Sequence, residues 1–517
     1  MQPNQKPEAV FELVKGMSKA EKRNFKLYAT RLAGNQEAKF LALFDALDAL
    51  DEYDEVKVLK RCPVKKEQLP NMKAHLLRQI LISIRLLSVQ HNVGMQLREQ
   101  IDFARIFYDK GFYKQALKIL DKAKEAAIEK EEHVIALEVV EFQKTIESLH
   151  ITRTLVDRSE AICRESTDLC ERVSASNDLS NLSILLYGLY LKLGYTRSAR
   201  DQHLVEKYFS KRIELYHRRK LSFTESISYH QAMVWYHYIR HDFPKCYKYA
   251  CLWMRLYDAN PQMKEEHYDN YLKGYARLLD NLYYMRSYKR FARAMEDLER
   301  QREAICSIND NARMLYLSVY YTGAMNRLFL EGRFSEGRRL IREVEEYLED
   351  YSRHIDVHHQ MMFFYKIACL CFGNDEYKNC IRYLQKIIST RDPMIRRDLQ
   401  CYARILMLIA SYEAGIDYNL DYQIRAVYAF LVKMNDMHEV QHEMISFLKR
   451  LNSAYTADIR AELNGLYEKL KPYESHPYER RTFYYLDILA WLESKIKGTT
   501  VAQVVRGHYE AAVGKGC

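Results

Sequence analysis

Glycine and proline are both scarce in this chain, with 17 and 9 residues out of 517. Sheet-rich folds need many tight turns, and these two residues supply much of the backbone conformation that tight turns require. Their scarcity therefore favours an all-α fold. A chain of this length exceeds the size at which one hydrophobic core keeps growing, so we expect several domains or one elongated array. The composition, 48% hydrophobic and 29% charged, is typical of a folded protein and excludes a disordered one.

Long apolar runs are also missing. The longest candidate, ILISIRLL at 80–87, is interrupted by Arg85 and falls well short of the roughly 20 residues that span a bilayer. The first residues, MQPNQKPEAV, lack the apolar core of a secretory signal. The eleven cysteines are odd in number and form no CxxC pair, which indicates reduced core thiols. We therefore expect a cytoplasmic protein without membrane insertion.

Signatures of nucleotide and ester chemistry are absent as well. The chain contains no GxxxxGKS or GxxxxGKT loop, no GxGxxG loop and no GxSxG elbow. These absences predict that the chain needs no cofactor and has no nucleophile of the hydrolase type. The formal charge of +10 is mild for 517 residues; it permits an acidic partner without requiring one.

What the chain does contain is a repeat. Five stretches share an aromatic residue three positions before a small or medium residue, followed by an apolar helix. They are GFYKQALKILDKA at 111–123, HDFPKCYKYACLW at 241–253, RSYKRFARAMEDL at 286–298, GRFSEGRRLIREV at 332–344 and NDEYKNCIRYLQKI at 374–387. Their aromatics are Tyr113, Phe243, Tyr288, Phe334 and Tyr377, and the last four are 45, 46 and 43 residues apart. Two weaker units, near Thr154–Asp157 and at 193–199, fit the longer gap between Tyr113 and Phe243.

The residues of each unit predict a helix, a short turn and a second helix. Gly111 and Gly332 would end first helices, because glycine adopts the left-handed cap conformation at little cost. The aromatic would pack across the turn. The small residue that follows would let the two helices approach closely, and it is Ala116, Cys246, Gly337 or Cys380.

This pattern resembles the tetratricopeptide repeat (TPR). The first unit matches best, at Phe103, Ala104 and Phe107 in the first-helix core and then at Gly111, Tyr113, Ala116, Leu120 and Ala123. A TPR unit takes about 34 residues, whereas these units take 43–46, so each helix should be about one turn longer. The resemblance covers roughly residues 95–450. It implies a right-handed α-solenoid of antiparallel helix pairs that binds a protein partner on its concave face.

The two ends differ from the repeats, as the terminal units of a solenoid should. SKAE at 18–21 is a capping-box signature with Ser18 as N-cap and Glu21 three residues on; the helix that follows would bury Phe25, Leu27 and Tyr28. We predict an N-terminal helical cap at 1–94, repeats at 95–450 and a C-terminal helical cap at 451–517. Both ends also resemble an uncharacterised bacterial family of helical-repeat proteins, a resemblance that implies no activity.

One stretch fits an enzyme motif. HEVQH at 438–442 matches the zinc-peptidase pattern, in which His438 and His442 bind zinc and Glu439 activates water. Glu462 is a tolerable third ligand by spacing. However, Asn435 and Asp436 are typical N-cap residues, and an apolar stripe follows, made of Met437, Val440, Met444, Phe447 and Leu451. The two histidines point away from that stripe. We therefore predict that both are exposed on a first turn with no third ligand in reach, and that a zinc metallopeptidase is the least favoured function.

Tyrosine is abundant, with 41 residues. Most should pack between helices with the hydroxyl at the surface, but tyrosine is also favoured at interfaces because it is large, rigid and polar at its tip. Counting back from each turn aromatic, as the TPR resemblance suggests, gives a mixed set that suits a peptide. The predicted partner-binding residues are Arg98, Arg105, Tyr108, Gln231, Trp235, Tyr238, Lys273, Asp280, Tyr283, Asn326, Phe329 and Tyr365.

Three basic clusters leave an alternative open: KRIELYHRRK at 211–220, GRRLIR at 337–342 and RDPMIRR at 391–397. We interpret them as solvated helix faces, mixed with acids or placed near helix C-termini where the dipole favours cations. His358 and His359 are likewise expected in a solvated first turn. The favoured function is a non-catalytic scaffold that binds a protein or peptide; the alternative is a nucleic-acid-binding helical repeat. The sequence sets no oligomeric state.

Overall fold

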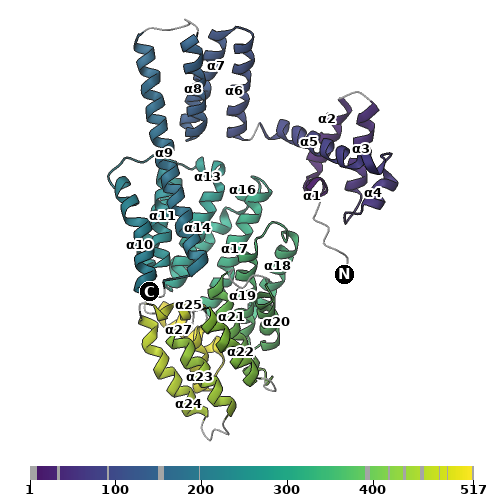
Figure 1. The fold of residues 1–517 in the computed structure, drawn as a ribbon. Coiled ribbons are helices and arrows are strands. Elements are labelled where there is room, and N and C mark those ends of the chain that lie inside the picture. The colour runs from purple at the N-terminus through teal and green to yellow at the C-terminus, as the bar shows by residue number, and fades with distance from the viewer. Residues whose placement is uncertain are drawn as a thin grey trace. The chain divides into compact units, whose positions relative to one another are not determined.

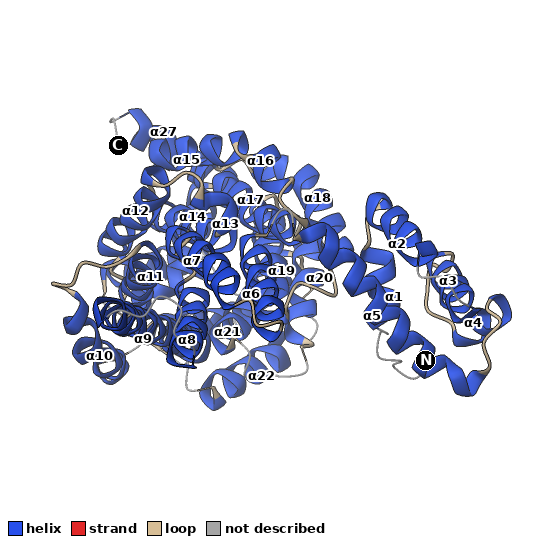
Figure 2. Ribbon diagram, turned by 90° about the horizontal axis from the view of Figure 1, so that it is seen from above, coloured by secondary structure: helices blue, strands red, loops and turns tan. Residues whose placement is uncertain are grey.

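A computed structural model describes residues 9–31, 35–89, 92–149, 156–196, 198–390, 396–416, 420–434, 438–453, 459–476, 478–485 and 487–514. Within these residues every regular element is an α-helix or a short 3-10 helix, and no strand occurs (Figure 1; Figure 2). The all-α prediction is confirmed for this part of the chain. The chain forms two compact units, Met1–Cys170 (unit 1) and Glu171–Cys517 (unit 2). The division between them falls inside the region predicted to be repeats.

Unit 1 begins with a small helical core. Its elements are α1 (Ala9–Gly16), α2 (Lys19–Arg31), α3 (Asn35–Asp48), α4 (Glu55–Arg61), η1 (Lys66–Gln68) and α5 (Leu69–Ser88). The capping box is present: Glu21 N donates to Ser18 Oγ at 3.2 Å, and Ser18 N donates to Glu21 Oε2 at 2.7 Å. Phe25 is fully buried against Phe44, but Leu27, predicted to be apolar-facing, is 50% exposed.

The second core of unit 1 contains α6 (Val93–Asp109), α7 (Tyr113–Glu129), α8 (His133–Leu149) and the start of α9 (Val156–Leu193). The pair α6–α7 is the first predicted repeat. Ala104, Ala116 and Leu120 are fully buried there. Phe103 and Phe107, predicted in the same core, are instead 42% and 37% exposed, because the buried stripe of α6 runs through Leu97, Ile101 and Ala104 and these rings lie on a separate stripe.

Unit 2 continues with helix pairs. Its elements as far as residue 433 are the rest of α9, α10 (Ala199–Ile213), η2 (Glu214–Tyr216), α11 (Phe223–Ile239), α12 (Phe243–Ala259), α13 (Met263–Glu266), α14 (Tyr268–Tyr284), α15 (Tyr288–Arg300), α16 (Arg302–Cys306), α17 (Asp310–Glu331), η3 (Phe334–Glu336), α18 (Gly337–Asp350), α19 (Val357–Gly373), α20 (Tyr377–Ile388), α21 (Arg397–Glu413) and α22 (Leu420–Lys433). The first helices α11, α14, α17, α19 and α21 pack on one another in sequence order, and each is also covered by a second helix of the pair before or after it. Stacked helix pairs of this kind are compatible with a helical-repeat protein.

The five predicted turns share one backbone geometry. In each, a residue with positive φ stands two positions before the aromatic: Gly111, His241, Arg286, Gly332 and Asp375, with φ between 49° and 80°. The next N–H then donates to the carbonyl five residues earlier, as Asp242 N does to His237 O at 3.0 Å and Glu376 N to Cys371 O at 2.8 Å. This is the Schellman motif, which satisfies the last free carbonyls of a helix. The expected unit near Thr154–Asp157 lies mostly outside the described residues; the unit at 193–199 has Gly194 at φ 69°.

The C-terminal elements are α23 (Glu439–Ser453), α24 (Ile459–Leu470), η4 (Lys471–Ser475), η5 (Glu479–Arg481), α25 (Thr482–Tyr485), α26 (Ile488–Lys497) and α27 (Val501–Gly514). They do not simply extend the stack. Helix α27 packs against α26 and returns to α17 and α15 in the middle of unit 2. The contact is close, because a Cβ on Gly332 would lie 2.6 Å from Arg506 N.

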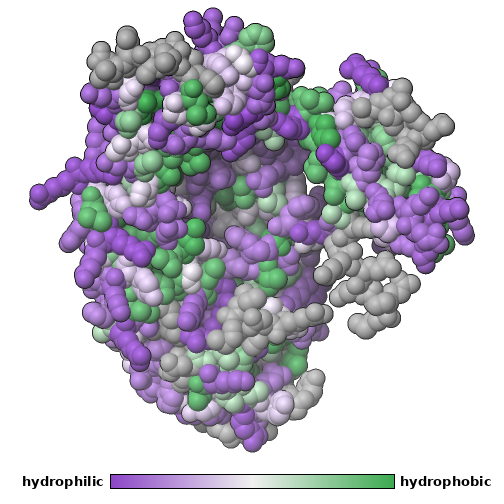
Figure 3. Space-filling model, turned by 45° about the horizontal axis from the view of Figure 1, so that its top comes forward, coloured by the Kyte–Doolittle hydropathy of each residue, from purple (hydrophilic) through white to green (hydrophobic). Residues whose placement is uncertain are grey.

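The thiols and the surface agree in part with the sequence analysis. Ten described cysteines are free; five are buried, but Cys163 and Cys170 are exposed. The face shown in Figure 3 is mainly hydrophilic, with apolar residues scattered over it. None of the described helices is long and apolar enough to cross a membrane.

Candidate functional site

One hollow of unit 2 has a volume of about 410 Å³, and we call it the cavity. Its walls come from the ends of α9 and α14, from α17 and α19, and from the C-terminal elements. The lining residues are mostly aromatic or charged: Tyr190, Tyr195, Tyr283, Tyr284, Tyr288, Phe329, Phe334, Tyr365, Phe372 and Phe483, with Arg286, Lys366, Arg396, Arg480, His508, Glu474 and Asp487. Burial raises the pKa of Tyr283, Tyr284 and Tyr365 above its ordinary value, so these hydroxyls are neutral at physiological pH.

Lys366 is a partly buried cation in the cavity wall. Its Nζ donates to Asn326 Oδ1 at 2.6 Å and lies 5.6 Å from the Tyr283 ring and 5.8 Å from the Phe329 ring. Among the described residues no carboxylate oxygen lies within 4.0 Å of this ammonium. Burial lowers the pKa of Lys366, and the nearby Asp280 partly opposes that shift. The lysine is therefore held in place by an amide and two rings rather than by a counter-ion.

Arg396 is the second cation of the wall, and it is almost fully buried, with 1% exposure. It forms a two-point ion pair with Asp398, 2.9 Å for each hydrogen bond, and lies 5.3 Å from the Tyr190 ring. It also lies 3.3 Å from His358 Nδ1. Burial, together with Arg396 and His359, lowers the pKa of His358 to about 3. The sequence pattern predicted that both side chains lie on solvated faces. That prediction is wrong for Arg396 and for His358, because both turn inward beside α9.

The C-terminal elements close the cavity on one side. Arg480 Nη2 donates to the carbonyl oxygen of His241 at 2.8 Å, and Asp487 pairs with Arg286 at 3.4 Å. Both partners are the positive-φ residues of repeat turns. Phe483, Val501, Val505 and His508 complete this wall. The segment thus lies along the turns of α11–α12 and α14–α15.

A second hollow, the cleft, has a volume of about 340 Å³. It lies between α9, α11 and α14 and is more polar than the cavity. Its lining comprises Ser176, Ser180, Ser183, Ile184, Tyr187, Thr224, Ile227, Ser228, Gln231, Trp235, Asn270 and Lys273. Lys273 is exposed and Gln231 is buried at its base. The mixture of hydroxyls, amides and one lysine suits hydrogen bonding to a peptide.

A cluster of rings joins the cleft to the cavity. Trp235 lies 4.9 Å from Tyr187 of the cleft and 5.3 Å from Tyr190 of the cavity. Arg277 lies 5.2 Å from Trp235 and 5.3 Å from Tyr238, and it pairs with Asp280 at 3.0 Å. The two hollows therefore share one wall of stacked rings and cations.

The predicted partner-binding residues fall into three groups. Tyr283, Phe329 and Tyr365 line the cavity, and Gln231, Trp235 and Lys273 line the cleft. Tyr238, Asp280 and Asn326 line neither hollow; they contact Arg277 or Lys366. Arg98, Arg105 and Tyr108 lie in unit 1, where Arg98 Nη1 donates to Gly94 O at 3.1 Å and Arg105 lies 3.7 Å from the Phe142 ring. Nine of the twelve thus gather around two hollows of one unit.

Apart from Lys273, the cations of this site were not predicted from the sequence. Arg277 precedes the predicted Asp280 by three positions, and Lys366 follows the predicted Tyr365 directly, so a search of the same helices for charged neighbours would have found both. Arg396 was noted only within the basic cluster at 391–397, which was interpreted as a solvated face, and the C-terminal wall gave no signal. They reach the cavity only because α21 and the C-terminal elements fold back beside α9 and α14.

The zinc-peptidase motif does not form a metal site in the described residues. No group of three His, Cys, Asp or Glu side chains there could hold a metal ion. His442 is exposed as predicted, but His438 is only 25% exposed and lies 3.7 Å from Glu479. The predicted exposure of His438 is wrong, because Glu479 covers the start of α23. Glu479 also accepts a hydrogen bond from Val440 N at 3.3 Å. Glu462 pairs with Arg450 at 3.1 Å. Asn435, Asp436 and Met437 lie outside the described residues.

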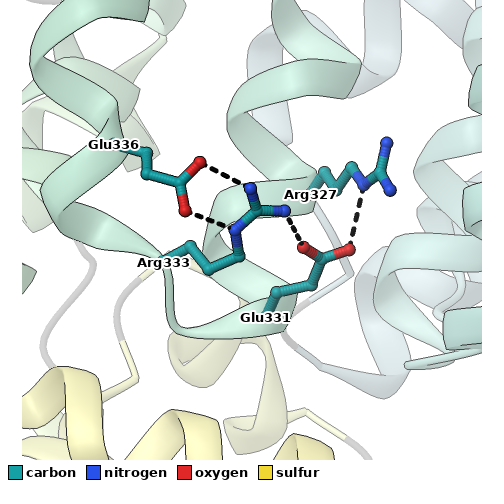
Figure 4. Close-up of polar contacts among 4 residues, drawn as sticks. All are labelled: Arg327, Glu331, Arg333 and Glu336. Carbon is teal, nitrogen blue, oxygen red and sulfur yellow. Dashed lines mark hydrogen bonds and ion pairs between the residues drawn. The ribbon is translucent and has the colours of Figure 1, made fainter.

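The basic cluster at 337–342 is largely paired. Arg338 bonds Glu376 at 2.5 Å and Arg339 bonds Glu343 at 3.0 Å. Just before it, Arg333 bridges Glu331 and Glu336, and Arg327 also bonds Glu331 (Figure 4). Hydrogen bonding from Arg333 lowers the pKa of Glu336. The cluster lies at the start of α18 and not near a helix C-terminus, so its cations are held by acids rather than by a dipole. Residues 391–395 lie outside the described residues.

No family model and no curated protein matches the chain.

Proposed function

We propose that unit 2 binds a segment of a partner protein along its inner face, by which we mean the cleft, the ring cluster around Trp235 and the cavity. The main support is that one aromatic ring contacts both hollows. The ring centroid of Trp235 lies 4.9 Å from that of Tyr187 in the cleft and 5.3 Å from that of Tyr190 in the cavity. A peptide on this face would find hydroxyls and amides at one end and aromatic walls with cations at the other. Interfaces that bind tightly have this composition, with aromatic and arginine anchors.

We also propose that the helix pairs form a right-handed TPR-like solenoid with about 43 residues per repeat. Support comes from the Schellman turns at His241, Arg286, Gly332 and Asp375, which are 45, 46 and 43 residues apart. The proposed organisation is an N-terminal cap at 1–94, repeats at 95–450 and a C-terminal cap at 451–517. The proposed role is that of a non-catalytic, cytoplasmic scaffold.

Site-specific photo-crosslinking tests the partner-binding proposal. A photoreactive residue at position 273, in the cleft, should crosslink one defined partner segment in cells. The same residue at position 422 serves as the control, because Tyr422 is 73% exposed on α22 and lies in neither hollow. Lys273→Glu in an otherwise unlabelled chain should compete poorly for that partner, while Tyr422→Ala should compete fully. Equal crosslinking at both positions, or full competition by Lys273→Glu, would contradict the proposal.

Nucleic-acid binding has weaker support. Arg338 and Arg339 are paired with acids, and Arg396 is buried, so these cations are not presented as a continuous basic stripe. If nucleic acid were bound through phosphate contacts, its affinity would fall steeply between about 50 and 200 mM salt.

A further inference from the structure

We propose that the cavity of unit 2 is a ligand site for an organic carboxylate with an apolar or aromatic body. Lys366 pairs with the carboxylate, and the surrounding rings hold the body. The ligand is either a free acid or the carboxylate end of a bound peptide. A free acid as the ligand would be a function separate from partner binding on the inner face. A peptide carboxylate as the ligand would specify which end of the partner segment binds there, and this case rests on the proposed function.

The size and walls of the cavity suit a small organic molecule. Pockets that enclose drug-sized ligands have volumes of about 300–1,000 Å³ and mainly apolar, aromatic linings with a few polar groups. The cavity, at about 410 Å³, has ten aromatic side chains in its lining. Tyr283 and Phe329 face the same ammonium from α14 and α17. An aromatic body packed among such rings would bury most of its surface.

Lys366 provides the polar anchor. A desolvated ammonium without a counter-ion is costly, and here Asn326 and two rings replace only part of its hydration. An incoming carboxylate would form a charge-assisted hydrogen bond in a water-poor site, where such bonds are strong. The site is preorganised, because the amide and the rings fix the ammonium before the ligand arrives.

The other charges of the wall are largely neutralised within the protein. Three carboxylates in or beside the wall are each paired with an arginine: Asp280 with Arg277 at 3.0 Å, Asp487 with Arg286 at 3.4 Å and Asp398 with Arg396 at 2.9 Å. Glu474 is exposed. Two cations remain, Lys366 and Arg480. Arg480 donates to a backbone carbonyl, and its buried Nε has no hydrogen-bond partner among the described residues. The wall of the cavity therefore carries a surplus of positive charge, which disfavours a cationic ligand.

The charge surplus also selects the kind of anion. The two unpaired cations, less the one carboxylate of Glu474, leave a surplus of one positive charge, which balances a monoanion such as a carboxylate. A phosphate dianion would carry more charge into an aromatic enclosure, and its desolvation would cost more. A neutral ligand would leave the ammonium without a counter-ion.

Calorimetric titration of the full-length chain with two matched pairs of probes tests this proposal. The first pair is 1-naphthaleneacetate and 1-naphthaleneacetamide; the second is N-acetyl-Leu-Phe with a free C-terminal carboxylate and with a C-terminal amide. For at least one pair, we expect the acid to bind ten or more times more tightly than the amide. Lys366→Met should reduce that preference to less than twofold. Lys386→Met is the matched control, because Lys386 also lies between two rings, Phe364 and Tyr383, but lines no part of the cavity.

A second variant guards against a folding defect in Lys366→Met. Val505→Trp adds bulk to the wall formed by the C-terminal elements and should abolish binding of the acid and the amide alike, while Lys366 itself is unchanged. Preference for only the naphthalene acid identifies a free acid as the ligand, and preference for only the dipeptide acid identifies a peptide end; either outcome supports the site. The proposal is overturned if no acid binds, if acid and amide bind equally, or if the preference survives Lys366→Met.

Discussion

Arg396 and Asp398 show how one residue pair can decide local stability. Both are at least 95% buried, and their two hydrogen bonds are 2.9 Å long. Arg396 also has positive φ, at 48°, a conformation that costs most residues about 1–2 kcal/mol. A buried pair of this kind need not stabilise the fold by itself, but the loss of one partner leaves a buried charge uncompensated.

We predict that Asp398→Asn destabilises unit 2 by about 3–5 kcal/mol. The substitution keeps the shape of the side chain and removes only its charge, so the loss comes from Arg396. Urea unfolding followed by tryptophan fluorescence measures it. Glu343→Gln, in the exposed pair with Arg339, is the control and should cost less than about 1 kcal/mol. Equal effects of the two substitutions would show that burial of the Arg396 pair is unimportant.

We predict that His230 contributes to the pH dependence of the stability of unit 2. Burial lowers the pKa of His230 from 6.5 to about 4, and its Nδ1 has no hydrogen-bond partner among the described residues. Below pH 6.5 the unfolded chain takes up a proton that the folded chain does not bind until about pH 4. The contribution of His230 to stability is therefore fully present above pH 6.5 and is lost as the pH drops toward 4.

The predicted loss from His230 alone is on the order of 1–2 kcal/mol between pH 7.5 and pH 5. His230→Gln should reduce the pH dependence of the free energy of unfolding by that amount. Urea titrations at the two pH values measure it. His442→Gln, at an exposed histidine, should leave the pH dependence unchanged. If both variants keep the dependence of the parent chain, His230 does not cause it.

At the scale of the element, the repeated turn explains what the sequence could predict. Spacing of aromatic and small residues located all five turns and the helices on either side of them, because these features are local and periodic. Glycine marked only two of the five positive-φ positions. At the others the Schellman hydrogen bonds and the packed aromatic hold His241, Arg286 and Asp375 in the same conformation. Composition alone could not identify these residues, since tertiary packing overrides their preference.

The turn at Gly332 carries a second constraint that its sequence does not reveal. Its φ is +66°, and an added Cβ would lie 2.6 Å from Arg506 N and 2.8 Å from Ala502 O. Gly415 has the same φ, +66°, but a Cβ there would meet nothing within 4 Å. The two glycines are therefore a matched pair that differ only in the docking of α27.

We predict that Gly415→Ala costs about 1–2 kcal/mol through backbone strain, whereas Gly332→Ala costs clearly more, because α27 must also move away. Hydrogen exchange should rise across Val501–Gly514 in Gly332→Ala and remain at the parent level in Gly415→Ala. Similar exchange in the two variants would mean that α27 is not docked on this turn.

At the scale of the whole molecule, the sequence could not predict that the C-terminal elements fold back onto earlier helices of unit 2. Three polar contacts join them to residues far earlier in the chain: Asp487 to Arg286, Arg480 to His241 and Tyr478 to Gln202. Each is a single pair without periodicity, so no pattern in the sequence reports it. The cavity exists only through this return. Three of its ten aromatic rings, those of Tyr283, Phe329 and Tyr365, were therefore predicted from the repeats, whereas its cations and its C-terminal wall were not.

The division into two units leads to the last prediction. Each unit has its own hydrophobic cores, and chains of this kind commonly unfold in more than one transition. The three tryptophans, Trp235, Trp253 and Trp491, all belong to unit 2. Tryptophan fluorescence therefore reports on unit 2, whereas far-ultraviolet circular dichroism reports on the helices of both units.

Substitutions at Leu120 and Leu406 test whether the two units unfold in separate transitions. Both are fully buried leucines, in unit 1 and unit 2 respectively, and replacement by alanine should cost each unit about 2–5 kcal/mol. In urea titrations, Leu120→Ala should shift part of the circular dichroism signal to lower urea and leave the fluorescence midpoint unchanged. Leu406→Ala should move the fluorescence midpoint. If Leu120→Ala shifts the fluorescence midpoint as far as Leu406→Ala does, the two units unfold together, since a cavity in one core then weakens both.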